Sequence, residues 1–193
     1  MSEKVEFFYD YVSIYSYLAD SQLATLAGAE IVYRPMLLGA VMEATGNRPP
    51  GTVEAKRKYL TTDIDRWAER YSLRFKMNPI FPQNTLKALR LALVAQKQGE
   101  FERVHRAIFE AMWAQEKDLA DEDVLAEIAA KVALSLKAIE DEAIKDELKA
   151  NSEEAVARGA FGAPTFFIGE QMFFGNDRFE FIKKALKNCR NRS

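Results

Sequence analysis

Strand-forming segments stand only at the two ends of this chain, and the long middle has helical periodicity throughout. Lys4 to Asp10 is short, aromatic and bounded by polar residues, and Glu30 to Pro35 has the same character. Between them, Ser16 to Ala27 has the period of a helix, which Gly28 ends. A strand, a helix and a strand within about 30 residues make a βαβ unit, whose strands run parallel.

The middle of the chain predicts helices only. From about Leu38 to Arg158 nearly every window has helical periodicity, interrupted by clusters of Gly, Pro, Asn and Asp. The predicted helices are Glu54 to Tyr71, Thr85 to Lys97, Phe101 to Gln115, Asp121 to Val132, and Leu136 to Arg158 with a possible break inside.

After Gly159 the strand pattern returns. Pro164 to Ile168 and Met172 to Phe174 predict a hairpin, and a last helix, Arg178 to Asn188, begins after Asn176 or Asp177 as its N-cap. The order of elements predicts an α/β protein with a thioredoxin-like fold and an all-helical domain inserted after the second strand. Residues 1–37 and 159–193 would form the thioredoxin-like domain, and residues 38–158 the helical one.

Composition excludes several classes of function. Among 193 residues, 27 Lys and Arg stand against 29 Asp and Glu, so the net charge of -2 disfavours nucleic acid and anionic membranes as partners. One cysteine, Cys189, and one histidine, His105, exclude an intramolecular disulfide and a multi-histidine metal site. Neither a signal peptide nor an apolar stretch long enough to cross a bilayer is apparent, which predicts a cytoplasmic protein.

The loop after the first predicted strand is the place where a ligand would bind. In an α/β unit, the carboxyl end of a strand faces the unpaired N–H groups of the next helix. Here the loop reads D-Y-V-S-I-Y-S-Y, and Ser13 and Ser16 stand where a thioredoxin-like oxidoreductase carries its cysteines. Serine cannot exchange disulfides, but it can donate a hydrogen bond to a thiolate brought in by a ligand. Either serine could instead act only as the helix N-cap.

Two further segments belong to the same region of the predicted fold. Pro164 opens a strand, and in a thioredoxin-like protein this loop holds a cis-proline whose preceding residue, here Ala163, offers its backbone to an extended peptide. Asn176, Asp177 and Arg178 open the last predicted helix next to that loop. They can cap the helix, and a carboxylate there also suits an incoming ammonium group.

These segments together resemble one family. The chain is similar to the glutathione-dependent branch of the DsbA-like thioredoxin superfamily, namely the kappa-class glutathione transferases and, more closely, the 2-hydroxychromene-2-carboxylate isomerases. The matching motifs span nearly the whole chain: F-Y-D-Y-V-S-I-Y-S-Y-L-A, Y-R-P-M-L-L-G, T-G-N-R-P-P-G, K-Y-L-T-T-D-I-D-R-W-A, F-G-A-P-T-F-F and F-G-N-D-R. Each motif is weak alone, whereas the set in this order is specific.

The resemblance implies a role for individual residues and names glutathione as the cofactor. Ser13 matches the catalytic serine that contacts the glutathione sulfur, and Ala163 matches the residue that pairs with the cysteinyl backbone. The remaining cofactor-binding positions are Asn47 and Lys56 at the glycine end, and Phe174, Gly175, Asn176 and Asp177 at the γ-glutamyl end. The resemblance also implies a homodimer.

The chain departs from the family pattern at three places. Ile14 replaces the proline that usually follows the first serine, and Met42 and Thr85 replace a lysine and a tyrosine of the naphthalene-pathway isomerase. An apolar acceptor pocket for an aromatic substrate is expected from a set of apolar residues between the predicted lobes. These residues are Met36, Met42, Phe81, Trp113 and Phe161.

The sequence therefore predicts a glutathione-dependent isomerase in which Ser13 stabilises a glutathione thiolate that attacks a small aromatic or conjugated substrate. Two alternatives remain at this point: a kappa-class-like glutathione transferase or peroxidase, and a non-catalytic peptide-binding relative. His105, on an amphipathic helix with no cysteine or second histidine nearby, is expected to be structural or solvent-facing.

Overall fold

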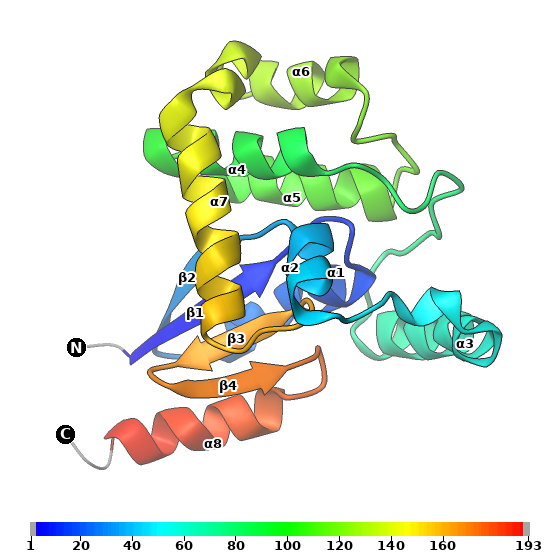
Figure 1. Cartoon of the computed structure of the whole chain (residues 1–193), viewed down its shortest axis with the longest axis vertical. Coiled ribbons are helices and arrows are strands. Elements are labelled where there is room, and N and C mark those ends of the chain that lie inside the picture. The colour runs from blue at the N-terminus through cyan, green and yellow to red at the C-terminus, as the bar shows by residue number, and fades with distance from the viewer. Residues whose placement is uncertain (1–2, 191–193) are drawn as a thin grey trace.

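The sheet has the strand order expected of a thioredoxin-like protein. The computed structural model describes residues 3–190 of the chain, and its four strands are β1 (Glu3–Tyr9), β2 (Ala29–Pro35), β3 (Thr165–Ile168) and β4 (Gln171–Phe174). Their order is β2-β1-β3-β4, with β1 parallel to β2 and antiparallel to β3, and β3 antiparallel to β4. The predicted fold class is confirmed (Figure 1).

Helices account for the rest of the regular structure. Their bounds are α1 (Ile14–Asp20), α2 (Leu38–Thr45), α3 (Glu54–Arg70), α4 (Leu86–Gln98), α5 (Phe101–Trp113), α6 (Glu122–Ala130), α7 (Glu142–Ala157) and α8 (Phe179–Arg190), with 3-10 turns η1 (Leu23–Thr25), η2 (Pro50–Thr52) and η3 (Leu136–Glu140). Figure 1 shows α4, α5 and α6 grouped above the sheet, α7 running along it, α8 below it and α3 projecting to one side.

Side-chain alternation along β1 explains why the sheet is covered on both faces. Phe7 points to the face where Phe166 stacks on it, at 5.1 Å between ring centroids, and this face belongs to the main core. Phe8 points to the opposite face, where its ring meets Phe167 edge-on in a second core cluster with residues of α2 and α7. The strand is therefore buried on both sides, as in other sheets covered by helices.

Two predicted helices begin or end differently from the prediction, and a third has the break that the sequence allowed. The segment 16–27 forms α1 and then η1, because the Ser21 hydroxyl donates to the Leu18 carbonyl and the chain turns there. The segment 136–158 is interrupted at Asp141, between η3 and α7, in agreement with the possible break predicted inside it. Helix α8 begins at Phe179, and since the Ile182 N–H donates to the Arg178 carbonyl, the N-cap is Arg178 rather than Asn176 or Asp177.

The helices from α2 to α7 all lie between β2 and β3 in the chain. The main core nevertheless runs from β1 directly into α4 and α5, where Phe109 packs against Tyr9 and Tyr11. The division of the chain into domains at residues 38 and 158 therefore stays a prediction. Across residues 3–190, the helices are too short or too polar to cross a membrane.

Asp10 fixes the end of β1 to two helices. Its carboxylate is buried and accepts hydrogen bonds from the Thr85 hydroxyl at 2.6 Å, from the Leu38 N–H at 2.9 Å and from the Val12 N–H at 3.1 Å. Burial raises the pKa of Asp10, and these donors lower it by a smaller amount. Thr85, one of the three positions at which the sequence departs from the family pattern, is itself buried in this contact.

We expect Thr85→Val to lower the free energy of unfolding by about 1–3 kcal/mol, because a buried carboxylate loses a donor. Thr52→Val is the matched control: the Thr52 hydroxyl donates to the Pro49 carbonyl at an exposed turn, and its loss should cost less than about 0.5 kcal/mol. Losing the donor raises the pKa of Asp10 further in the folded state only, so the penalty should grow as pH rises through that pKa. Urea titrations at several pH values measure the free energy of unfolding of each variant. Equal losses of this free energy in Thr85→Val and Thr52→Val would contradict this account.

Candidate functional site

Ser13 caps α1 and joins it to a loop far away in the sequence. Its backbone is extended, its Oγ accepts a hydrogen bond from the Ser16 N–H at 3.1 Å, and its hydroxyl donates to the Ala163 carbonyl at 3.0 Å. Ser13 is only 7% exposed. The N-cap role is therefore observed, together with a second bond that a capping residue does not need.

The loop that carries Ser13 is held from behind by the core. The Tyr11 hydroxyl lies 2.9 Å from His105 Nδ1, and His105 Nε2 lies 3.0 Å from Asp20 Oδ1. The Trp113 indole N–H donates to the Tyr11 carbonyl at 2.8 Å. His105 is buried, so it has the structural role that the sequence predicted.

The loop before β3 forms the opposite side of the Ser13 contact. The Ala163–Pro164 peptide bond is cis, and the Thr165 hydroxyl donates to the Gly162 carbonyl at 2.8 Å. The Gly175 N–H donates to the Pro164 carbonyl at 3.0 Å, which joins this loop to the turn after β4. A Cβ at Gly162 would lie 2.8 Å from the Phe174 ring, so only glycine fits there without displacing that ring.

Asn47 connects a third loop to the same place. Gly46 ends α2 in the left-handed conformation, and the chain then presents Asn47, whose Nδ2 donates to the Phe161 carbonyl at 2.7 Å. The Asn47 Oδ1 accepts from the Arg48 N–H at 2.8 Å. Asn47 therefore holds the loop before Pro164 against the end of α2, and one N–H of its amide remains for a ligand.

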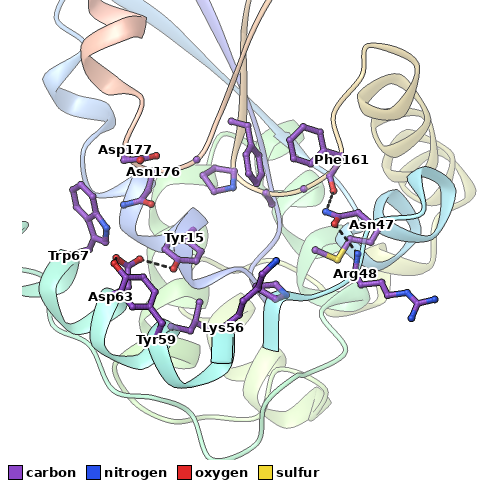
Figure 2. Close-up of a pocket in the computed structure, with 18 of the residues that line it drawn as sticks. Tyr15, Asn47, Arg48, Lys56, Tyr59, Asp63, Trp67, Phe161, Asn176 and Asp177 are labelled. Carbon is purple, nitrogen blue, oxygen red and sulfur yellow. Dashed lines mark hydrogen bonds between the residues drawn. The ribbon is translucent and has the colours of Figure 1, made fainter. Parts of the chain in front are cut away.

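One face of α3 supplies a row of polar side chains. Lys56, Tyr59, Asp63 and Trp67 are spaced three or four residues apart and all line the same cavity. The Asp63 carboxylate accepts from the Tyr15 hydroxyl at 2.8 Å and from the Tyr59 hydroxyl at 3.3 Å (Figure 2). Burial and the neighbouring Asp63 carboxylate raise the pKa of Tyr15, so its phenol stays protonated.

The turn between β4 and α8 closes the cavity. The Tyr71 hydroxyl donates to the Asn176 carbonyl at 3.1 Å, and Asp177 forms an ion pair with Arg178. The Asn176 side chain is 4% exposed, and its Nδ2 has no hydrogen-bond partner within the described residues. A buried amide without a partner is uncommon in native proteins.

These elements surround a cavity of about 800 Å³. Figure 2 shows Asn47 and Arg48 at one end and Asp63 and Asp177 at the other, with Lys56 between them. Arg48 therefore lies toward one end of the cavity and Lys56 in its middle, while Asp63 and the Asp177–Arg178 ion pair lie toward the other end. An elongated ligand with an anionic group at one end and a cationic group at the other would match this arrangement.

The cavity brings together the positions that the resemblance implied for cofactor binding. Its wall includes Asn47, Lys56, Ala163, Phe174, Gly175, Asn176 and Asp177. Ser13 does not belong to the wall and reaches it through its hydrogen bond to Ala163. The structure thus groups the eight positions, with the serine behind the carbonyl of Ala163.

The predicted apolar acceptor pocket is wrong in part. Met42 and Phe161 line the cavity, but Met36 is fully buried in the core cluster beneath α2. Trp113 is also fully buried, and Phe81 packs against it with tilted rings, at 5.8 Å between ring centroids, away from the cavity wall. The physical reason is that these side chains pack into the core or against it, which an apolar pattern does not distinguish from a pocket.

Sequence reasoning missed Tyr15, Tyr59 and Asp63 as cavity residues. Tyr59 and Asp63 share a helix face with Lys56, a residue that was predicted, so their spacing was an available signal. Tyr15 gave no such signal, because only the packing of α1 against α3 places its hydroxyl on Asp63.

Comparison with known proteins identifies the family. The model of the DSBA-like thioredoxin domain matches residues 4–187, so the chain belongs to that family. A 2-hydroxychromene-2-carboxylate isomerase from Sphingobium xenophagum is 31% identical over 195 residues, covering 96% of this chain and 99% of that protein. Glutathione S-transferase kappa 1 of Caenorhabditis elegans is 29% identical over 205 residues, covering 95% of this chain and 91% of that protein.

A solved structure supports the same assignment. That of a 2-hydroxychromene-2-carboxylate isomerase has a TM-score of 0.86 and 26% sequence identity, and the match covers 98% of this chain and 97% of the other. The resemblance inferred from the motifs is therefore confirmed, both for the DsbA-like fold and for the relatedness to these isomerases and to kappa-class transferases.

We expect Tyr15→Phe to destabilise the protein by about 1–2 kcal/mol, because the half-buried Asp63 carboxylate loses its shorter hydrogen bond. Tyr59→Phe is the control on the same carboxylate: its hydroxyl is exposed and 3.3 Å away, so its loss should change stability by less than about 0.5 kcal/mol. Chemical denaturation of both variants compares them. A larger loss for Tyr59→Phe would show that α3 is not held through Tyr15.

Proposed function

We propose that this protein is a glutathione-dependent isomerase that acts on a small aromatic or conjugated molecule. The observation that supports this most directly is the distribution of charge in the cavity, with Arg48 at one end, Lys56 in the middle, and Asp63 and the Asp177–Arg178 ion pair at the other end. Glutathione has a glycine carboxylate at one end and both an ammonium group and a carboxylate at the other. The positions of these charged groups match a cavity of this kind, and the relatives include isomerases and glutathione transferases.

The buried amide of Asn176 is one feature of the cavity that a glutathione molecule would satisfy. Its Nδ2 is buried, lacks a partner among the described residues, and belongs to a residue of the cavity wall. The γ-glutamyl end carries a carboxylate, which is the acceptor that such an amide requires. The adjacent Asp177 carboxylate suits the γ-glutamyl ammonium group, so the turn between β4 and α8 fits this end of glutathione.

With the γ-glutamyl end of glutathione at this turn, the remaining contacts of the tripeptide can be assigned. We assign the glycine carboxylate to Lys56 and to the remaining N–H of Asn47, and the γ-glutamyl end to the turn Phe174–Asp177. The backbone of Ala163 would pair with the cysteinyl residue, which brings the thiol toward Ser13. Met42 and Phe161 provide apolar surface beside this position for the substrate.

Bound glutathione would supply a thiolate that adds reversibly to a conjugated double bond, so that the bond can rotate before the thiolate leaves. Ser13 favours the ionised sulfur by donating a hydrogen bond to it. A free cysteine thiol has a pKa near 8.5, so lowering it by about one unit increases the thiolate fraction about eightfold at neutral pH. Burial and the neighbouring Asp63 raise the pKa of Tyr15, so this phenol stays neutral in the site.

A kappa-class-like transferase or peroxidase is the second candidate, because the kappa-class relatives are almost as similar to this chain as the isomerases. The same residues would hold the thiolate in both cases. The two activities separate in assays: cis–trans isomerisation regenerates glutathione, whereas chlorodinitrobenzene consumes it in an adduct and cumene hydroperoxide oxidises it.

We expect glutathione to stabilise the protein against heat, since a ligand at 100 times its dissociation constant adds about 2.7 kcal/mol to the free energy of unfolding.

Ser13→Ala should lower turnover at least about tenfold, because the thiolate loses its donor, and should change glutathione affinity little. Calorimetry measures glutathione binding and thermal stabilisation, and a steady-state assay measures turnover. No binding at millimolar glutathione would exclude the proposed function, and unchanged turnover in Ser13→Ala would exclude a catalytic role for this serine.

Lys56→Gln should weaken glutathione binding about tenfold, because one charge-assisted hydrogen bond to a carboxylate is lost. Lys58→Gln is the matched control on the same helix: its ammonium is exposed, pairs with Glu54 and lies outside the cavity wall. Titration calorimetry at low and high salt compares the variants, and the wild-type affinity should fall with salt more than that of Lys56→Gln. Equal losses in the two variants would exclude Lys56 as the carboxylate ligand.

A further inference from the structure

We propose that the Ala163 carbonyl controls the hydroxyl of Ser13: it holds the hydroxyl proton until an amide N–H of the bound ligand replaces it, and only then does Ser13 donate to the sulfur. This inference rests on the proposed function and adds a condition to it. The ligands that the site activates are thiols with an amide N–H on the carbon adjacent to the sulfur-bearing carbon, as in an N-acylated cysteine.

The hydrogen bonds of Ser13 are the first line of argument. A serine hydroxyl has one proton and two lone pairs. The proton is donated to the Ala163 carbonyl at 3.0 Å, because a carbonyl oxygen can only accept, and one lone pair accepts from the Ser16 N–H at 3.1 Å. Ser13 therefore has no proton to offer a thiolate unless it leaves Ala163.

The second line of argument is the arrangement of the cavity wall. Ala163 lines the cavity, whereas Ser13 and Ser16 do not. The Ser16 hydroxyl is fully buried and makes no hydrogen bond among the described residues, so it does not substitute for Ser13 at the cavity. Tyr15, the tyrosine of this segment that lines the cavity, already donates its hydroxyl proton to Asp63 at 2.8 Å.

Releasing Ser13 leaves the Ala163 carbonyl in need of another donor. Within residues 3–190, Ser13 is the one hydrogen-bond donor to this carbonyl, and Ala163 is 9% exposed. Because an unsatisfied carbonyl is costly, the hydroxyl leaves only when another donor takes its place, and in a cavity filled by the ligand that donor is the ligand N–H. Recognition of the ligand backbone and stabilisation of its thiolate are then one coupled event.

The exchange balances without a further reactant. The bond that breaks is the S–H bond of the ligand, whose proton passes to water. Ser13 keeps its proton and only changes the acceptor from the carbonyl oxygen to the sulfur. A simple alkyl thiol lacks the amide N–H, so its thiol should ionise in the site no more readily than in water.

Two ligands test the inference on the wild-type protein. One is glutathione, and the other is a depsipeptide analogue in which an ester oxygen replaces the cysteinyl N–H. Calorimetry establishes saturation, and thiolate absorbance near 240 nm, followed against pH, gives the pKa of each bound thiol. We expect a pKa lowered by about one unit for glutathione, a tenfold change in the thiolate-to-thiol ratio, and a nearly free value for the depsipeptide.

Two variants distinguish which serine hydroxyl lowers the pKa of the bound thiol. Ser13→Ala should raise the pKa of bound glutathione to the depsipeptide value, while Ser16→Ala, which removes a hydroxyl without a hydrogen bond, should leave it lowered. Equal pKa values for the two ligands in the wild-type protein would overturn the exchange and leave the proposed function intact. Failure of both ligands to bind would overturn the proposed function together with the exchange.

A spectroscopic measurement follows the carbonyl directly. Ala163–Pro164 is the only Ala–Pro pair in the sequence, so ¹³C-carbonyl alanine with ¹⁵N proline gives one resonance for this peptide. Without ligand, Ser13→Ala should shift that resonance, because the carbonyl loses its donor. With glutathione bound, wild type and Ser13→Ala should give the same shift, and a persistent difference would show that Ser13 never leaves the carbonyl.

Discussion

The pairing of β1 with β3 is the constraint on which the candidate site depends. Phe8 of β1 lies opposite Thr165 of β3, so the chain that leaves β1 and the chain that enters β3 meet at one edge of the sheet. Ser13 and Ala163, 150 residues apart, come within hydrogen-bond distance there. The bond between them combines helix capping with closure of the cavity wall, and any chemistry at this serine has to begin from that bonded state.

The site has a second side that is built independently of the sheet. Helix α3 projects from the body of the protein and turns one face toward the cavity, where Lys56 and Asp63 supply opposite charges (Figure 1). Tyr15 ties this face to α1 through Asp63. The distance between the sheet-edge loops and α3 therefore determines which ligands fit, and an elongated zwitterion uses both sides at once.

The periodicity of the sequence predicted the helices and strands better than it predicted the surroundings of single side chains. Aromatic alternation in Lys4 to Asp10 and the helical period of Glu54 to Tyr71 appear in the structure as β1 and α3 with nearly the same bounds. Trp113 and Met36 were misplaced, because an apolar residue on an amphipathic element can face either the core or a pocket. The cofactor positions came from motifs of a family, and the cavity groups them without testing their roles.

The sequence by itself determined the order of strands and helices, the presence of a single cysteine, and the membership of a family, since these depend on local periodicity and on residue identity. Tertiary structure alone decided that Ser13 donates to Ala163, that the buried amide nitrogen of Asn176 has no partner among the described residues, and that Tyr15 meets Asp63. Each of these depends on the three-dimensional direction of a hydrogen bond or on its absence. Such directions arise only when segments far apart in the chain pack together, which no local pattern encodes.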